Sequence, residues 1–470
     1  MNTDRFTPSA ESVFDALHDA LGSGVVQRVE DVGTRAWSDA SGSPCVEPSL
    51  LLRPGSTSEL ATAMRICHEF HQPVSVQGGL TGLSGGACPG RGELAVSLER
   101  MRGIESIDPV AATMTVLAGT PLEQVQRAAD EAGLLFPLDL GARGTCSIGG
   151  NLATNAGGNR VIRYGMMRDQ TLDVEAVLAD GTIVGGLRPM MKNNTGYDLK
   201  HLLIGSEGTL AIITRAVLRL RPKPRAISTA FCGLRDYTSV AALLSKAQAA
   251  LPAGVSAFEV MWPSFYDFYT SRLHELRRPL TGDHGFYVLL ESMGADPELE
   301  TDVFESFLAS MFEDGIVEDA ALAGSHKDAL DFWAIRDAVS ENGRLLPDHV
   351  AFDISFAAPA IFDAARRCEA SLRQRWPDAT VLVYGHVGDG NIHVVVQEPS
   401  WPASEAHEAQ ELVYSIVGDM HGSVSAEHGI GMKRRHVLGL TRTPAEIACM
   451  RAIKGALDPR GLLNPGRVLG

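Results

Sequence analysis

Two histidines and a glutamate in the C-terminal third have residue types and spacing typical of a catalytic metal site. His386 and His393 flank a Gly-Asp-Gly turn in YGHVGDGNIHVVV (residues 384–396), so the bend can bring both imidazoles together. About 40 residues later, VSAEHGIGMKRR supplies Glu427 and His428. Two histidines and a carboxylate leave coordination positions open for water or substrate, and they do not choose between zinc, manganese and iron.

The residues alone also allow a structural interpretation of this cluster. A histidine beside a turn is commonly a surface residue or a satisfied core residue. Glu427 has three cations nearby in the sequence, Lys433, Arg434 and Arg435, and could form a salt bridge with any of them. Spacing by itself leaves both interpretations open.

Two glycine-rich regions predict a cradle for a cofactor. QGGLTGLSGGACPG (residues 77–90) joins the strand-like PVSV (73–76) to the strand-like ELAVSL (93–98), and a second region lies between 133 and 165. Backbone N–H groups that side chains do not shield form concave anion sites suited to a pyrophosphate. Flexible linkers carry no embedded strands, so we favour the cradle.

Neither glycine region has the fingerprint of a nicotinamide-binding Rossmann unit. That fingerprint needs G-x-G-x-x-G after a strand and at the start of a helix, whereas residues 77–90 join strand to strand. GDGNIH has Gly388 and Gly390 but His393 in place of the third glycine, and a strand-like segment follows. A nicotinamide-dependent dehydrogenase is therefore disfavoured.

Length and charge exclude several classes of protein. A chain of 470 residues is too long for one hydrophobic core, and 45% hydrophobic with 21% charged residues is typical of folded globular proteins. Lys and Arg number 41 against 57 Asp and Glu, giving a net charge of −16. This surface repels nucleic acid and anionic lipid, so an anionic substrate would need a local cationic pocket.

The distribution of apolar residues and cysteines predicts a cytoplasmic protein. We expect neither a secretory signal nor a transmembrane span, because the N-terminal segment has acidic residues and no eighteen-residue apolar run occurs. The cysteines never form a C-x-x-C pair, so we expect them to be reduced and an iron–sulfur cluster to be absent. They are Cys45, Cys67, Cys88, Cys146, Cys232, Cys368 and Cys449.

Local patterns indicate how the chain is organised. Ser56 and Glu59 have the spacing of a helix capping box, and a hairpin should turn at Asp180-Gly181. Prolines 222 and 224 end the first half; from about 225 to 420, strand-like and helix-like pieces alternate with fewer glycines, which predicts a second domain. The segment from about 422 is expected to be helical.

Six motifs in order give the chain a family resemblance. QGGLTGLSGG, SIGGNLATNAGGN, GYDLKHLLIGSEGTL, HVGDGNIH, SAEHGIG and LNPGRVL occur in the order found in the FAD-linked oxidases of the vanillyl-alcohol oxidase superfamily. The chain resembles the branch with the D-lactate and D-2-hydroxyglutarate dehydrogenases and the glycolate oxidase flavin subunit.

The resemblance implies an α+β fold. It implies a lead-in (1–43), a PCMH-type FAD-binding domain in two subdomains (44–224), a ferredoxin-like antiparallel substrate domain, or cap (225–421), and a C-terminal segment that returns to the flavin (422–470).

The resemblance also implies which residues hold FAD. No histidine occupies the loop where some superfamily members tether FAD, so non-covalent binding is expected. Leu80 stands where relatives often have Gly or Asn. The implied residues are Gln77, Gly78, Gly79, Leu80, Thr81, Gly82 and Leu83 in the first loop, Pro137, Asp139, Ser147, Gly150, Asn151, Asn155, Gly157 and Gly158 in the second, and Glu207, Gly208 and Asn464 near the flavin.

By the same resemblance, His386, His393 and Glu427 are the metal ligands, with zinc preferred over manganese or iron, and His428 is the base. A divalent cation lowers the pKa of a coordinated oxygen, so the 2-hydroxyl of a D-2-hydroxy acid could give its proton to His428 while the C2 hydride goes to flavin N5.

Arg336 in FWAIRDAVS matches the family's tryptophan and arginine motif. It would bind the substrate carboxylate through its planar fork, and Ser340 could add a hydroxyl. On position alone Arg336 would be a helix-surface residue beside Asp331 and Asp337.

Two departures from the family bear on the substrate. Ala351 stands where the hydroxyglutarate enzymes carry Lys, and Val395 stands where they tend to carry Asn. A second substrate carboxylate would lose both partners. The two departures therefore favour D-lactate, glycolate or a more apolar 2-hydroxy acid as the substrate. Hydroxyglutarate stays open because His349, Lys433, Arg434 and Arg435 are other cationic candidates.

The expected partners are a small 2-hydroxy acid and an electron acceptor such as a quinone, an electron-transfer flavoprotein or a cytochrome. The chain is expected to form a homodimer. An alternative is a glycolate-oxidase-type flavin subunit, whose iron–sulfur clusters would lie on other chains. A metal-binding module without catalysis would leave the glycine cradle unexplained.

Overall fold

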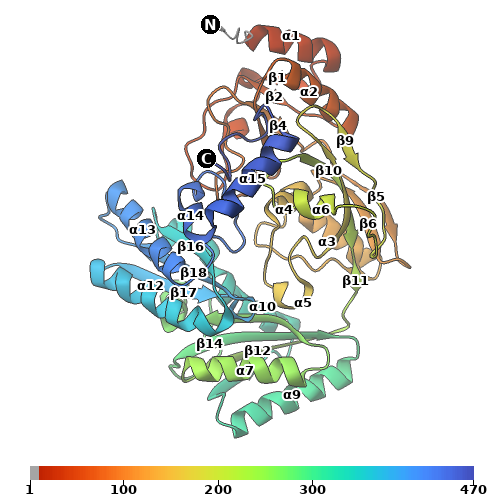
Figure 1. The fold of residues 1–470 in the computed structure, drawn as a ribbon. Helices are drawn as coiled ribbons and strands as arrows, with labels where there is room; N and C mark the ends of the chain where they lie inside the picture. The colour runs from red at the N-terminus through yellow and green to blue at the C-terminus, as the bar shows by residue number, and fades with distance from the viewer. Residues whose placement is uncertain (1–9) are drawn as a thin grey trace.

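A computed structural model describes residues 10–470 and divides their elements into two groups (Figure 1). The first group, red to yellow, contains sheets of four, five and two strands; the second, green to blue, contains one sheet of seven. This mixed architecture confirms the expected α+β class.

The four-stranded sheet carries the strand from which the first glycine loop leaves. Its order is β1-β2-β4-β3, with β2, β4 and β3 parallel. Helix α2 begins as expected because the Ser56 hydroxyl accepts the N–H of Glu59 at 3.2 Å. Residues 77–90 join β3 to β4, so the strand-to-strand connection is confirmed. The elements are α1 Ala10–Leu21, β1 Val26–Arg28, β2 Leu50–Leu52, α2 Thr57–Glu69, β3 Val74–Gln77 and β4 Leu94–Ser97.

The five-stranded antiparallel sheet, in the order β5-β6-β10-β8-β9, supports the second glycine region. The hairpin predicted at Asp180-Gly181 is confirmed: the Leu178 N–H donates to the Thr182 carbonyl at 2.9 Å. Helices α3 and α4 pack on this sheet. The elements are β5 Ile104–Asp108, β6 Thr113–Leu117, α3 Leu122–Glu131, β7 Leu134–Leu135, α4 Ile148–Thr154, α5 Val161–Tyr164, β8 Thr171–Val177, β9 Ile183–Gly185, α6 Leu199–Leu203, β10 Ile212–Arg219 and β11 Arg221–Pro222.

The seven-stranded antiparallel sheet has the order β15-β12-β14-β13-β17-β18-β16. Helices α7, α9, α12 and α13 cover one face and α8 and α10 the other, so its strands are apolar on both sides. The strands are β12 Ala226–Leu234, β13 Val255–Met261, β14 Phe286–Gly294, β15 Asp319–Leu322, β16 Val350–Ser355, β17 Thr380–Gly385 and β18 Asn391–Gln397. The helices are α7 Tyr237–Ala250, α8 Pro263–Arg272, α9 Pro297–Glu313, α10 His326–Asp337, α11 Asn342–Leu345, α12 Ile361–Arg375 and α13 Ala403–Asp419.

The C-terminal segment returns to the first half (Figure 1). Residues 422–434 are not helical, so the expectation of a helical segment from about 422 is wrong for them; the glycines in this stretch favour a loop. Helices follow at α14 Leu438–Thr441 and α15 Pro444–Leu457. Leu463 then forms a parallel bridge with Val74 of β3, which extends the four-stranded sheet.

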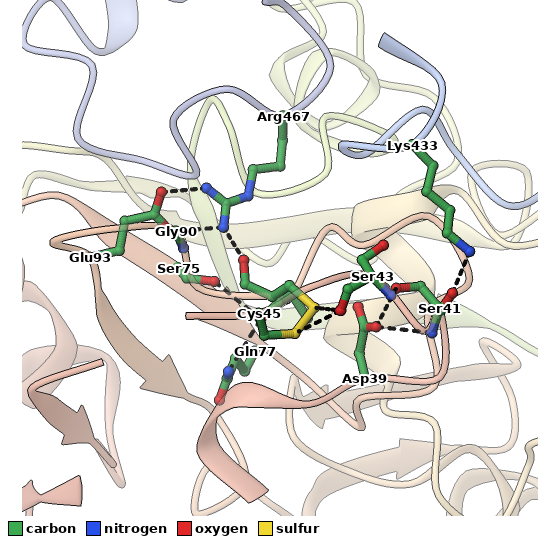
Figure 2. The surroundings of a disulfide bond; sticks show 12 residues. Asp39, Ser41, Ser43, Cys45, Ser75, Gln77, Gly90, Glu93, Lys433 and Arg467 are labelled. Atoms are coloured by element: carbon green, nitrogen blue, oxygen red, sulfur yellow. Dashed lines mark hydrogen bonds and ion pairs between the residues drawn. A yellow bond between two sulfur atoms is a disulfide. The ribbon is translucent and has the colours of Figure 1, made fainter. Parts of the chain in front are cut away.

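A disulfide joins Cys45 to Cys88, so the expectation that all seven cysteines are reduced is wrong. Scattered spacing did not reveal that the chain before β2 lies over the first glycine loop, where the Val46 N–H donates to the Pro89 carbonyl at 2.9 Å. Figure 2 shows the surroundings, including Lys433, which donates to the Ser41 carbonyl.

None of the helices among residues 10–470 has the length and apolar character needed to cross a membrane.

Candidate active site

A cavity of about 1050 Å³ is lined by both glycine regions and by the seven-stranded sheet. It brings together all the predicted site residues except Pro137 and Asn155. Pro137 is buried outside the lining, and Asn155 ends helix α4, where its side chain accepts the Arg168 N–H at 2.9 Å. The predicted residues that line it are Gln77, Gly78, Gly79, Leu80, Thr81, Gly82, Leu83, Asp139, Ser147, Gly150, Asn151, Gly157, Gly158, Glu207, Gly208, Asn464, Arg336, Ser340, His386, His393, Glu427 and His428.

The two glycine regions pack against each other, which explains several of the glycines. A Cβ on Gly78 would lie 2.5 Å from Ser147 Oγ, and one on Gly79 would lie 2.1 Å from the Thr145 carbonyl oxygen. Only glycine permits this approach. The resulting wall of exposed backbone, facing a large cavity, fits the pyrophosphate of a dinucleotide such as FAD.

Leu80 has a φ of 60°, in the left-handed region that glycine and asparagine adopt most readily. The family's preference for Gly or Asn here thus has a backbone cause. The Leu80 carbonyl accepts the N–H of Ala40, so the strained turn also joins the first glycine loop to the segment before β2.

The proposed metal ligands converge. One ligand atom each of His386, His393 and Glu427 lies within 4.8 Å of the others, although Glu427 comes from a separate loop. Burial lowers the pKa of His393 well below its usual range, which favours the neutral imidazole that binds metals. Burial also opposes the charged form of His386, but Glu259 outweighs burial and raises the His386 pKa to about 9, so His386 gives up a proton when it binds a cation. This donor set fits a divalent cation.

The salt bridge that the sequence left open for Glu427 does not form. The three cations have other partners: Lys433 donates to Ser41, Arg434 to Tyr414 and Gly429, and Arg435 to Gly466. Glu427 instead lies against the second glycine region, since a Cβ on Gly157 would be 2.5 Å from its Oε1. The cluster of His386, His393 and Glu427 is therefore contiguous with the glycine regions.

Asp353 on β16 fixes the loop that carries Glu427 and His428. Its Oδ2 accepts the backbone N–H groups of Glu427 and His428, each at 2.9 Å, and lies 3.5 Å from His428 Nδ1. Burial disfavours the charged form of Asp353, but His428, His393 and the backbone donors outweigh it and hold the pKa far below its usual range. An ionised Asp353 thus orients the His428 imidazole.

Glu207 joins the first half of the chain to the C-terminal segment. Its carboxylate accepts the N–H groups of Ile430 and Gly431 at 2.7 and 2.8 Å, and its backbone carbonyl accepts the Asn464 side chain at 2.7 Å. Asn464 also accepts the N–H of Val76 at 2.8 Å. Both residues line the cavity, but their polar side-chain groups are already used to join four distant segments.

Arg336 lies inside the protein rather than on a helix surface. It is 6% exposed, its Nε donates to Glu259 at 2.6 Å, and its guanidinium stacks on the Tyr384 ring at 4.9 Å. Ser340 also lines the cavity, with its hydroxyl donating to the Asp337 carbonyl. A guanidinium therefore lines the cavity beside His386, with its charge paired to Glu259.

The two substrate-related departures form one apolar spot. Ala351 and Val395 are directly paired across β16 and β18, and Val395 is paired with Leu382 on the next strand. Ala351 lines the cavity, whereas Val395 is 1% exposed and belongs to the apolar core rather than to the lining.

Comparisons with known proteins agree with this arrangement. Residues 48–185 match the FAD binding domain family, and residues 223–468 match the family described as FAD linked oxidases, C-terminal domain. The chain belongs to the FAD-linked oxidases. This FAD-linked oxidase is 38% identical to the mitochondrial D-2-hydroxyglutarate dehydrogenase of Bos taurus over 89% of its own length and 76% of the relative's.

Bacterial and fungal relatives give the same picture. A D-2-hydroxyglutarate dehydrogenase of Xanthomonas citri pv. viticola is 36% identical, covering 93% of this FAD-linked oxidase and 90% of the relative. A putative mitochondrial D-lactate dehydrogenase of Schizosaccharomyces pombe is 33% identical, covering 88% and 81%. The chain therefore lies in the 2-hydroxy acid dehydrogenase branch.

Solved structures confirm the fold of this FAD-linked oxidase. A p-cresol methylhydroxylase superposes with a TM-score of 0.77 at 16% identity, covering 97% of this chain and 96% of that one. An alkyldihydroxyacetonephosphate synthase gives 0.74 at 18% identity, covering 97% and 86%.

Sequence reasoning missed Glu259 and Asp353 in this FAD-linked oxidase. Each is a single acidic residue inside an otherwise apolar strand, FEVM and VAFDIS. Acidic residues are rarely buried without a partner, so their position was an available signal.

Proposed function

We propose that this FAD-linked oxidase is a metal-assisted dehydrogenase of small D-2-hydroxy acids. The main support for this proposal is that His386, His393 and Glu427 converge beside His428 at the end of the glycine cradle. These groups suit oxidation of a carbon that bears a hydroxyl. Non-covalent FAD and zinc are part of the proposal.

His428 is proposed to accept the proton of the 2-hydroxyl. Its Nδ1 faces Asp353, which leaves Nε2 to act as the base and stabilises the imidazolium that forms. When bound, the metal would polarise the 2-hydroxyl and FAD would accept the C2 hydride. The chain thereby supplies the base, its orientation and the ligands.

Arg336 is proposed to bind the substrate carboxylate. Arg336 Nη2 lies 3.3 Å from His386 Nε2, which supports binding of the carboxylate beside the carbon whose hydroxyl would face the metal ligands. The apolar pair of Ala351 and Val395 favours a short or apolar substrate side chain over a second carboxylate. We therefore propose D-lactate or a D-2-hydroxy acid with an aliphatic side chain before D-2-hydroxyglutarate.

Anaerobic bleaching of the flavin absorbance tests this function. The purified protein is mixed with D- and L-2-hydroxy acids before and after treatment with a chelator. Reduction by a D-acid that stops after chelation and returns with Zn²⁺ is expected. Reduction that is equally fast after chelation would remove the three metal ligands from the proposal. If none of the acids reduces the flavin, the proposal is overturned.

A further inference from the structure

Glu259, on strand β13, holds two functional side chains at once. Its Oε1 accepts a hydrogen bond from His386 Nδ1 at 2.6 Å, and its Oε2 accepts one from Arg336 Nε at 2.6 Å. Glu259 is 1% exposed and Arg336 is 6% exposed, so water cannot replace either bond. A single carboxylate therefore fixes a proposed metal ligand and the proposed carboxylate anchor.

The bond to Glu259 selects the ligand nitrogen of His386. Because Nδ1 keeps its proton for Glu259, the lone pair that can bind a metal is the one on Nε2. A carboxylate in this position orients a metal-binding imidazole and increases its basicity. The tautomer that can bind a metal is thus set from strand β13.

The same Nε2 lies 3.3 Å from Arg336 Nη2. Nε2 has one lone pair, so it cannot accept a hydrogen bond from Arg336 and bind a cation together. A cation bound to His386 would release Nη2 while Nε stays paired with Glu259. The freed Nη edge then has the geometry to bind a carboxylate through two hydrogen bonds.

We propose that Glu259 is a positioning residue that couples metal binding to binding of the substrate carboxylate. The inference rests on the proposed function, which gives His386 and Arg336 their roles. A single substitution of Glu259 should therefore lower the metal affinity and raise the KM for the acid. Glu259 itself need not contact the metal or the acid.

Glu259→Gln is the main test. A glutamine side chain can accept only one of the two hydrogen bonds, because its NH2 group meets a donor on the other side. We expect the Zn²⁺ affinity of the FAD-loaded protein, measured by competition with a chromophoric chelator, to fall about 10- to 100-fold. The KM for the D-acid should stay raised even at saturating Zn²⁺, because the substitution also weakens the hydrogen bond that orients Arg336.

Glu291→Gln is the matched control. Glu291 lies on the adjacent strand β14 and is 2% exposed, and it accepts hydrogen bonds from Arg160 and Trp333 at 3.2 and 3.1 Å. It should change thermal stability without changing Zn²⁺ affinity or KM. An equal loss in both variants would overturn the coupling. If Glu259→Gln does not fold, Glu259→Asp keeps the charge but reaches only one partner, and the same two readouts apply.

The outcomes separate this inference from the proposed function. A wild-type protein that binds no Zn²⁺ or is reduced by no D-acid contradicts the proposed function and with it the coupling. A wild-type protein that does both, with Zn²⁺ affinity and KM unchanged in Glu259→Gln, overturns the role of Glu259 alone.

Discussion

Asp353 Oδ2 accepts the backbone N–H of His428 at 2.9 Å and lies 3.5 Å from Nδ1 of the same residue. One carboxylate oxygen thus fixes both the loop position and the ring orientation of His428. Replacement by Asn removes the charge that stabilises the imidazolium.

We expect Asp353→Asn to slow flavin reduction by about 100-fold or more, the usual size of a general-base contribution. Rapid-mixing measurement of a single turnover at saturating D-acid checks this. Ser425→Ala is the control, because Ser425 Oγ donates to the same Asp353 oxygen at 3.1 Å without touching the ring. If Asp353→Asn reacts as fast as Ser425→Ala, Asp353 does not orient the base.

The apolar pair of Ala351 and Val395 predicts a change of specificity. We expect Ala351→Lys combined with Val395→Asn to increase kcat/KM for D-2-hydroxyglutarate relative to D-lactate by about 10-fold or more, the size of a charged hydrogen bond. Steady-state kinetics with both acids give the ratio. Ala351→Leu adds bulk without charge and should not raise it; a ratio that stays constant in the double variant would contradict this assignment of the substrate side-chain region.

The left-handed backbone at Leu80 predicts a stabilising substitution. This conformation costs an ordinary residue about 1–2 kcal/mol, and asparagine adopts it more readily. Leu80→Asn should therefore raise the free energy of unfolding by about 0.5–1 kcal/mol in denaturant titrations. Leu83→Asn is the control, since Leu83 is 42% exposed and has no positive φ. Equal changes in both variants would exclude backbone strain as the cause.

The disulfide between Cys45 and Cys88 predicts dependence on reducing agent. It closes a loop with a sequence separation of 43, for which the chain-entropy account gives about 4 kcal/mol. Ala40 and Ser41 line the cavity near this bridge. We expect Cys45→Ser, or treatment with a dithiol, to lower the melting temperature and to speed the loss of FAD on dilution.

Cys449→Ser provides the comparison, because Cys449 is exposed and unpaired. Mass spectrometry after alkylation should find Cys45 and Cys88 unmodified until the protein is reduced. Alkylation of both in the untreated protein would show that the bridge is absent.

The sequence predicted the local features well and the distant contacts poorly. Ser56, the turn at Asp180-Gly181 and the loop of residues 77–90 depend on neighbouring residues, and the structure confirms each of them. The family resemblance predicted that His386, His393 and Glu427 lie together, and one ligand atom of each lies within 4.8 Å of the others.

The contacts that could not be predicted from the sequence depend on pairing between strands. Glu259 lies 127 positions from His386, and Asp353 lies 75 positions from His428. No periodicity links residues so far apart; their contact is fixed by the order of strands in the sheet. Cys45 and Cys88 lie in loops 43 positions apart, one before β2 and the other between β3 and β4, so no local pattern indicated their proximity either.

The pairing of Leu463 with β3 and the bonds of Asn464 to Val76 and Glu207 have a consequence for biosynthesis. On the ribosome, the first half is made long before these residues emerge. Until they do, β3 has an unpaired edge and the Glu207 carbonyl lacks its hydrogen bond from Asn464. A nascent chain therefore lacks the contact at Val74 and the bond that holds the Glu207 loop until residue 464 has emerged.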